Sequence, residues 1–197
     1  MNSTRRIILA SQSPRRIRLL KQIGLNPEVI PSSVEEAFDP SLTPDQNARK
    51  LALAKADHVG RLIADGIVIG ADTIVVLGDV LLGKPANRVE AKQMLRQLSG
   101  QEHTVITAFS LLDLPGGRHQ CESEKTRVTF RNLPDEEIDR YVAGGSPMDK
   151  AGAYGIQDDY GAVFVSRIEG CFYNVVGFPL SKFYTTLQEF IAGNSVT

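Results

Sequence analysis

The sequence has few of the residues that build disulfides, redox sites and metal sites. Its two cysteines, Cys121 and Cys171, and its three histidines follow no metal-binding or redox spacing. We therefore expect free thiols and a reducing compartment. The sequence also has no glycine-rich loop that ends in Lys-Ser or Lys-Thr, which excludes ordinary P-loop chemistry.

An excess of charge of one sign and a long apolar run are missing as well. The formal net charge is −1, so no global basic field attracts a nucleic acid polymer. After Arg5 and Arg6 only residues 7–10 are apolar, which is too short for the core of a signal peptide. No run approaches the length that spans a membrane. We expect a cytoplasmic protein with no membrane partner.

The 197 residues suit one domain, 1–197, built either as a single body or as two lobes that share one sheet. Strand and helix signals alternate, with antiparallel pieces inserted, which predicts an α/β fold with a mixed sheet. Strands are predicted at 6–10, 25–31, 67–77, 103–112, 122–130 and 162–168. Helices are predicted at 14–23, 43–64, 87–98, 134–142 and 180–190, with a turn at 174–179 and a frayed tail at 193–197.

The most informative stretch is the predicted hairpin formed by 67–77 and 80–85, which a Gly-Asp turn joins. Asp72 lies in the middle of its first, largely Val and Ile run. A buried unpaired carboxylate costs several kcal/mol, so Asp72 needs a partner, a metal ion or an opening to water. Lys84 follows the second run, and the hairpin can return it toward Asp72. The alternative is a structural aspartate held by hydrogen bonds.

The first strand leads into a helix that Ser13 caps and that Arg15 and Arg16 occupy at its start. Free N–H groups at a helix N-terminus attract anions, and arginine binds phosphate through two parallel hydrogen bonds. Arginines at this end oppose the helix dipole unless an anion is present. The interpretations as a phosphate site and as two solvated arginines are equally supported by this segment alone.

Four further features are weaker taken singly. Glu35 and Glu36 lie in an acidic segment that can supply a magnesium ligand or simply be solvated. Lys55 lies on or beside the apolar stripe of the second predicted helix, where it either extends to solvent or reaches a phosphate. His103 starts a predicted strand, and a structural role is favoured for it. The small residues of 149–157 permit close approach to a ligand, and Gln157 offers an amide that can read a base edge.

Six motifs in this order closely resemble those of the Maf family of nucleoside triphosphate pyrophosphatases, across almost the full chain. They are ASQSPRR (10–16), GADT (70–73), GKP (83–85), SGQEH (99–103), DKAGAYGIQ (149–157) and NVVGFP (174–179). Two positions depart from the family pattern. Ala108 stands where glycine is usual, and Phe178 stands where leucine is usual.

The resemblance implies an elongated fold like that of inosine triphosphate pyrophosphatases, with two lobes around a cleft. It implies hydrolysis of a nucleoside triphosphate to the monophosphate and pyrophosphate, in nucleotide pool sanitation, with Mg²⁺ or Mn²⁺. The motif forms are similar to the branch that acts on dTTP and UTP rather than the branch that acts on 7-methyl-GTP. A homodimer is left open.

The resemblance also implies roles for individual residues. Asp72 is the proton acceptor, and Glu36 with Asp72 holds the metal ion. The remaining residues bind substrate: Arg15, Thr73 and Gln157 take part in substrate choice, and Ser11, Arg16, Lys55 and Lys84 line the phosphate site.

Two other functions compete with this hypothesis. One is a non-catalytic nucleotide-binding regulator of septum formation and cell division, an association that the family also carries. The other is a phosphatase that releases inorganic phosphate stepwise. Asp72, Lys84 and Glu36 favour catalysis, and the identity of the products separates the two enzymes.

Overall fold

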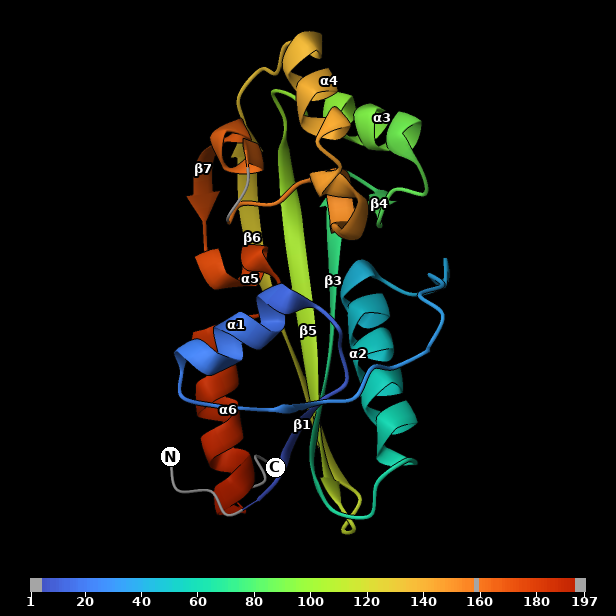
Figure 1. Cartoon of the computed structure of the whole chain (residues 1–197), viewed down its shortest axis with the longest axis vertical. Coiled ribbons are helices and arrows are strands. Elements are labelled where there is room, and N and C mark those ends of the chain that lie inside the picture. Colours follow the sequence, from blue (N-terminus) through green and yellow to red (C-terminus); the bar gives the residue numbers. More distant parts are fainter. Residues whose placement is uncertain (1–4, 158–159, 194–197) are drawn as a thin grey trace. The chain divides into compact units, whose positions relative to one another are not determined.

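The fold is a mixed α/β arrangement around a seven-stranded sheet, as the sequence predicts (Figure 1). The computed structural model describes residues 5–157 and 160–193. The strand order is β2-β1-β3-β5-β6-β7, and β4 pairs with β3. β1 is parallel to β2 and β3, whereas the pairs β3–β4 and β6–β7 are antiparallel. The strands are β1 (Ile7–Leu9), β2 (Glu28–Val29), β3 (Gly66–Leu77), β4 (Val80–Leu82), β5 (Glu102–Leu114), β6 (Arg118–Phe130) and β7 (Val165–Glu169).

Helices connect most of these strands. The α-helices are α1 (Pro14–Gln22), α2 (Pro44–Gly60), α3 (Arg88–Leu98), α4 (Asp135–Ala143), α5 (Phe172–Val176) and α6 (Leu180–Ala192). Three short 3₁₀ helices lie at η1 (Ser146–Asp149), η2 (Ala151–Ala153) and η3 (Tyr160–Phe164). Among the described helices, none combines the length and the apolar character needed to cross a membrane.

The chain divides into two compact units. Unit 1 comprises Met1–Asp72, Thr107–Glu124 and Gly177–Thr197, and unit 2 comprises Thr73–Ile106 and Lys125–Val176. β3, β5 and β6 each contribute residues to both units. The predicted cleft between two lobes, and the single domain 1–197, stay predictions.

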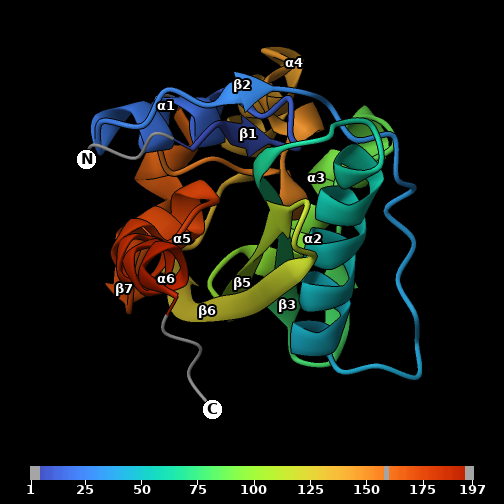
Figure 2. The ribbon, with the colours of Figure 1, turned by 90° about the horizontal axis from the view of Figure 1, so that it is seen from below.

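In unit 1 the helices α2 and α6 lie on opposite sides of the strands (Figure 2). On the α2 side, Ala56 and Val59 pack with Ile8 and Val68 of the parallel pair β1–β3. Gly70 of β3 allows this helix to approach closely, because a Cβ atom there would lie 2.0 Å from the carbonyl oxygen of Ala52. The sequence of β3 therefore fixes how α2 packs at the level of Asp72.

The other face of unit 1 carries a cluster of three phenylalanines. Phe178 packs against Phe109 of β5 and Phe183 of α6, with ring centroids 5.9 and 4.7 Å away. Phe178 is completely buried. At this position, where the family pattern has leucine, an aromatic side chain fills the core.

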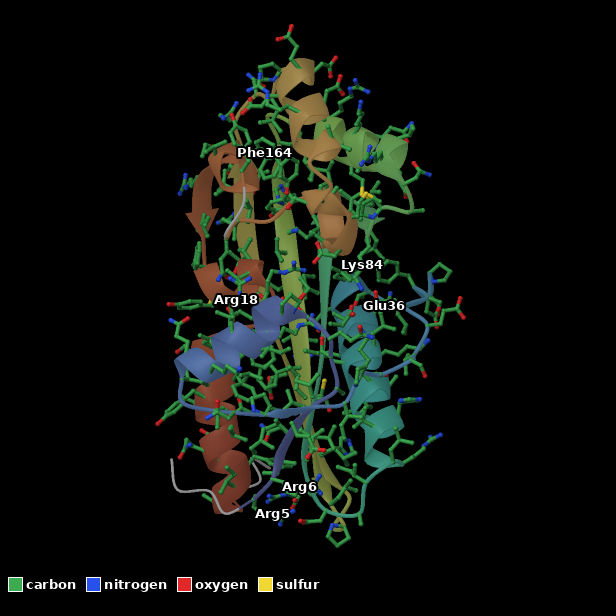
Figure 3. The ribbon with its side chains drawn as sticks, in the orientation of Figure 1. Arg5, Arg6, Arg18, Glu36, Lys84 and Phe164 are labelled. Carbon is green, nitrogen blue, oxygen red and sulfur yellow. The ribbon has the colours of Figure 1, made fainter. Side chains whose placement is uncertain are left out.

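Unit 2 contains the paired end of the predicted hairpin. Val75 pairs with Leu82 and Leu77 pairs with Val80, so the turn is the expected Gly78-Asp79 pair, with Gly78 at φ +56°. Helices α3 and α4 lie side by side (Figure 1). Phe164 packs edge-on against other aromatic rings of the core (Figure 3).

Several predicted boundaries are wrong. The strand predicted at 25–31 is only the two-residue β2, and the strand predicted from 122 begins at Arg118. The helix predicted to end at 64 ends at Gly60, where a Cβ atom would lie 2.7 Å from Leu112 Cδ2. The strand predicted from 162 begins at 165, because residues 160–164 form η3. The turn predicted at 174–179 instead overlaps the helix α5, which ends at Val176. The predicted tail lies outside the described residues from 194 onward.

Candidate active site

The centre of the candidate site in unit 1 is an ammonium group between two carboxylates. Lys55 Nζ lies 2.6 Å from Asp72 Oδ1 and 2.6 Å from Glu36 Oε1. The side chains of Lys55 and Asp72 are 8% and 7% exposed, whereas that of Glu36 is 37% exposed. α2 supplies Lys55, β3 supplies Asp72, and the segment between β2 and α2 supplies Glu36 (Figure 3). The three predicted residues therefore form one contact group that is buried at one end and open to solvent at the other.

The pKa of Asp72 is raised above its usual value, and burial is the main cause. Lys55 and Arg16 oppose this shift because their positive charges favour the carboxylate form. Asp72 is thus a carboxylate kept in an apolar strand by a neighbouring cation. A carboxylate with a raised pKa is a stronger base than an exposed aspartate, which suits proton transfer.

Arg16 is buried and faces the backbone beside Asp72. Its Nη1 atom donates to the carbonyl oxygen of Ala71 at 2.8 Å and to Ser11 Oγ at 3.3 Å, while its Nε atom donates to the carbonyl oxygen of Gly177 at 3.0 Å. Burial lowers the pKa of Arg16, and the charges of Asp72 and Glu36 raise it. The guanidinium group holds β3 in place next to Asp72 and adds positive charge to the site.

The N-terminus of α1 has the predicted cap. Ser13 accepts a hydrogen bond from the backbone N–H of Arg16, and Pro14 occupies the first helical position. Ser11 accepts a further hydrogen bond from the backbone N–H of Ser13 at 3.2 Å. Arg15 is half-buried in the first turn of this helix. Unit 1 thus contains Ser11, Arg15 and Arg16 on one strand-to-helix connection.

The other predicted residues belong to unit 2. Thr73 directly follows Asp72, and Lys84 is an exposed residue just after β4 (Figure 3). Because Leu82 pairs with Val75, the chain after β4 runs back toward the Thr73 end of this part of β3. Gln157 follows a buried run, 152–156, and its Oε1 atom is buried without a hydrogen-bond partner among the described residues.

The available oxygen ligands fit a cation that binds together with the substrate phosphates, and they do not fit a metal site built from protein ligands alone. Among residues 5–157 and 160–193, no group of three or more His, Cys, Asp and Glu residues can hold a metal ion. Asp72 and Glu36 provide two carboxylates that share one ammonium neighbour. Mg²⁺ typically takes one or two carboxylates and completes its shell with water and substrate phosphates. The two acidic residues meet that requirement.

The structure adds two features that the sequence did not reveal. Arg16 and Gly177 are separated by 161 positions, so no local signal marks the carbonyl oxygen of Gly177 as a partner of the guanidinium group. His103 lies in the core of unit 2 and contacts the hydroxyl group of Tyr154 at 2.8 Å. The motif that contains each of these residues was visible in the sequence, but the contact was not.

Comparison with known proteins identifies the family and the relatives of this chain. The sequence model of the family described as Maf-like protein matches residues 6–190. A dTTP/UTP pyrophosphatase of Caldicellulosiruptor saccharolyticus is 46% identical over 189 residues, which cover 94% of each chain. A dTTP/UTP pyrophosphatase of Pelotomaculum thermopropionicum is 48% identical over 184 residues, which cover 93% of this chain and 96% of that protein. One of Shouchella clausii is 48% identical over 183 residues, with coverage of 93% and 94%.

Proposed function

Since this chain belongs to the Maf-like protein family, we propose that it hydrolyses dTTP and UTP to the monophosphate and pyrophosphate. The observation that carries the proposal is the buried Asp72 carboxylate, held by Lys55 and flanked by Glu36. A structural ion pair needs only one carboxylate. The second, partly exposed carboxylate leaves the group open to a ligand that carries its own cation.

In the proposed reaction, Asp72 accepts a proton from a water molecule that attacks the α phosphorus. A bond forms between the water oxygen and the α phosphorus, and the bond from that phosphorus to the oxygen that bridges to the β phosphorus breaks. Pyrophosphate leaves with the electron pair of the broken bond. Burial raises the pKa of Asp72 and Lys55 opposes that rise, so Lys55 favours the carboxylate form that accepts the proton.

Positive side chains would bind the triphosphate. Arg15, Arg16 and Lys84 neutralise its charge and the charge that develops in the transition state, and Ser11 donates from its hydroxyl group. Arg16 has a second role in this scheme. Its hydrogen bond to the carbonyl oxygen of Ala71 fixes the backbone that carries the base.

Thr73 and Gln157 would select the base. The buried Oε1 atom of Gln157 accepts no hydrogen bond within the described chain, so it lacks a donor. Thymine and uracil present an N–H donor between two carbonyl groups, whereas cytosine presents an acceptor at the same ring position. An amide that offers a free acceptor therefore favours dTTP and UTP over CTP.

Asp72 and Glu36 would hold the divalent cation, Mg²⁺ or Mn²⁺, together with oxygen atoms of the substrate. When bound, the cation supplies positive charge to the phosphate oxygens. Lys55 sits between the same two carboxylates, so it keeps them from repelling one another in the free protein.

The test is incubation with dTTP or UTP and Mg²⁺, followed by identification of both products. We expect pyrophosphate and the monophosphate in equal amounts, and Asp72→Asn should lose at least about a hundredfold in rate. The matched control is Asp79→Asn, which makes the same change of charge on the exposed turn after β3. Inorganic phosphate with a diphosphate product would instead identify a phosphatase. Nucleotide binding with no product would support the non-catalytic regulator.

The cytoplasmic location and the open question of a homodimer stay predictions. Size-exclusion chromatography with light scattering measures the second directly.

A further inference from the structure

The loop that precedes Gln157 contains a strained turn. Gly152 has φ +67° and Ala153 has φ +60°, and among the described residues Ala153 is the only one other than glycine with a positive φ. Both residues are buried. A side chain is unfavourable in this conformation and persists there only when its surroundings hold it, which is common at ligand-binding sites.

The turn is fastened to the segment that carries Lys84. The backbone N–H of Gly152 donates to the carbonyl oxygen of Gly83 at 3.0 Å. A Cβ atom on Gly152 would lie 3.0 Å from Val75 Cγ2, so this glycine packs closely on the strand β3. The position of the turn therefore determines where Gly83, and with it Lys84, can lie.

Two hydrogen bonds hold the chain just after the turn. The hydroxyl group of Tyr154 lies 2.8 Å from His103 Nε2, and the backbone N–H of Gly155 donates to the hydroxyl oxygen of Tyr141 at 3.3 Å. The ring of His103 also meets Tyr154 and Phe130 edge-on, with centroids 5.4 and 4.9 Å away. His103 is 2% exposed, so the ring cannot move to another partner without disturbing the core.

A histidine at position 103 is energetically unfavourable as a residue that only fills the core. Its Nδ1 atom is buried with no hydrogen-bond partner among the described residues. Burial lowers the pKa of His103 to about 4, so the ring is neutral at neutral pH and one of its nitrogens can donate while the other accepts. A phenylalanine would fill a similar volume without an unpaired nitrogen. What the histidine adds is the directional bond to Tyr154.

We propose that His103 is a positioning residue of the nucleotide site. Through the hydroxyl group of Tyr154 it holds the Gly152–Ala153 turn, and through that turn it sets the places of Lys84 and Gln157. The inference rests on the proposed function, because it assigns a consequence to Lys84 and Gln157 as substrate-binding residues. This role would explain the presence of His103 in the SGQEH motif, none of whose residues takes part in the proposed reaction.

The first experiment compares His103→Phe, Tyr154→Phe and the double variant with the wild type on dTTP and dCTP. Each single variant should raise the KM for dTTP about tenfold, as expected for one lost hydrogen bond, and should reduce the preference for dTTP over dCTP. The fall in kcat should be smaller than the rise in KM, because Asp72 and Lys55 are untouched and only Lys84 among the groups that neutralise the transition state is displaced. His103→Gln, whose amide can still bond to the hydroxyl group, should recover part of the KM. The matched control is Tyr184→Phe, which removes a hydroxyl group from an exposed tyrosine of α6.

The double variant separates positioning from simple core stability. With both polar partners replaced by phenylalanine no buried group is left unpaired, so the melting temperature should recover toward the wild-type value. KM and base preference should stay impaired, because the bond that places the turn is still absent. If KM and base preference recover together with the melting temperature, His103 is only a core residue and the proposal is wrong.

Hydrogen exchange gives a measurement that does not depend on activity. The amides of Gly152 and Gly155 should exchange about tenfold faster in Tyr154→Phe, whereas the amide of Ala10, bonded to Ile69 in unit 1, should be unchanged. Tyr154→Phe removes one oxygen atom and keeps the test usable if His103→Phe does not fold. If the wild type releases no pyrophosphate but these amides exchange faster in Tyr154→Phe, the proposed function is wrong and the structural role of Tyr154 in holding the turn is supported. If the wild type is active but both exchange and KM are unchanged in Tyr154→Phe, the positioning role falls.

Discussion

Lys55→Met tests the central contact of the site most directly. Methionine keeps the unbranched stem and removes the ammonium group that contacts Asp72 and Glu36. Asp72 then stays buried without its cation, and removing one partner of a buried ion pair costs about 3–5 kcal/mol. Glu36 is open to water, which replaces the lost contact, so it adds less than about 1 kcal/mol. At pH 8 we expect the free energy of unfolding to fall by about 3–5 kcal/mol.

The loss should depend on pH with a definite sign. Burial already raises the folded-state pKa of Asp72 above its unfolded value, and removal of Lys55 raises it further. The folded variant therefore binds more protons than the unfolded chain between these two values, and its stability falls as pH rises through that window. At pH 5 a larger fraction of Asp72 is protonated, and a neutral carboxyl group is less costly to bury. The loss should be smaller at pH 5 than at pH 8.

Urea unfolding at both pH values measures this difference. The chain has no tryptophan, so tyrosine fluorescence and far-UV circular dichroism serve as two independent probes, and their transitions should coincide. Asp72→Asn placed in the Lys55→Met background should restore most of the lost stability, because it removes the unpaired charge. An equal loss at pH 5 and pH 8, or no recovery in the double variant, would refute the assignment of Lys55 as the cation that holds Asp72.

Three further predictions follow from burial and packing. In kinetics on dTTP, the acid limb of the pH profile should have a midpoint above 3.8, the ordinary pKa of aspartate, and Asp72→Asn should be inactive across the whole profile. Gly70→Ala should lower the free energy of unfolding by about 1–3 kcal/mol or more, because its Cβ atom would lie 2.0 Å from the carbonyl oxygen of Ala52, whereas Gly116→Ala, with open space around it, should cost little. The pKa of His103 is 6.5 in the unfolded chain and about 4 in the folded protein, so protonation favours the unfolded chain as the pH falls between these values. The free energy of unfolding of the wild type should therefore fall by about 3 kcal/mol from pH 6.5 to pH 4, and that of His103→Phe should lack this contribution.

Local chemistry made part of the fold predictable. The Gly-Asp turn between β3 and β4 and the cap of α1 by Ser13 are both specified by neighbouring residues, and both are confirmed. Helix α5 was missed because its placement depends on distant partners. Its Asn174 side chain donates to the carbonyl oxygen of Val105 and to Thr126 Oγ1, neither of which is near it in sequence.

The end of α2 shows the same limit. Leu62 and Ile63 continue the apolar pattern, so periodicity extends the helix beyond Gly60. The helix ends at Gly60, whose position beside Leu112 of β5 leaves no space for a Cβ atom. This contact with a strand far away in sequence is not visible in the apolar pattern.

The contacts of the proposed site residues could not be predicted from the sequence. For Lys55 the pattern left open solvent or a phosphate, and the structure pairs it with Asp72 and Glu36 instead. For Arg16 the helix N-terminus suggested a group that faces an anion, and the structure adds hydrogen bonds from the guanidinium group to backbone carbonyl oxygens of its own chain. The orientation of a lysine or arginine side chain depends on hydrogen-bond acceptors that lie near it only in the folded protein.

The division of the chain has a consequence for how such a protein can be altered. Asp72 and Thr73 are covalent neighbours but belong to different units, and both ends of the polypeptide belong to unit 1. Unit 2 is an insertion in two pieces, so neither half corresponds to one continuous stretch of gene. Recombination that exchanges the whole of unit 2 as one continuous segment therefore also exchanges residues 107–124 of unit 1.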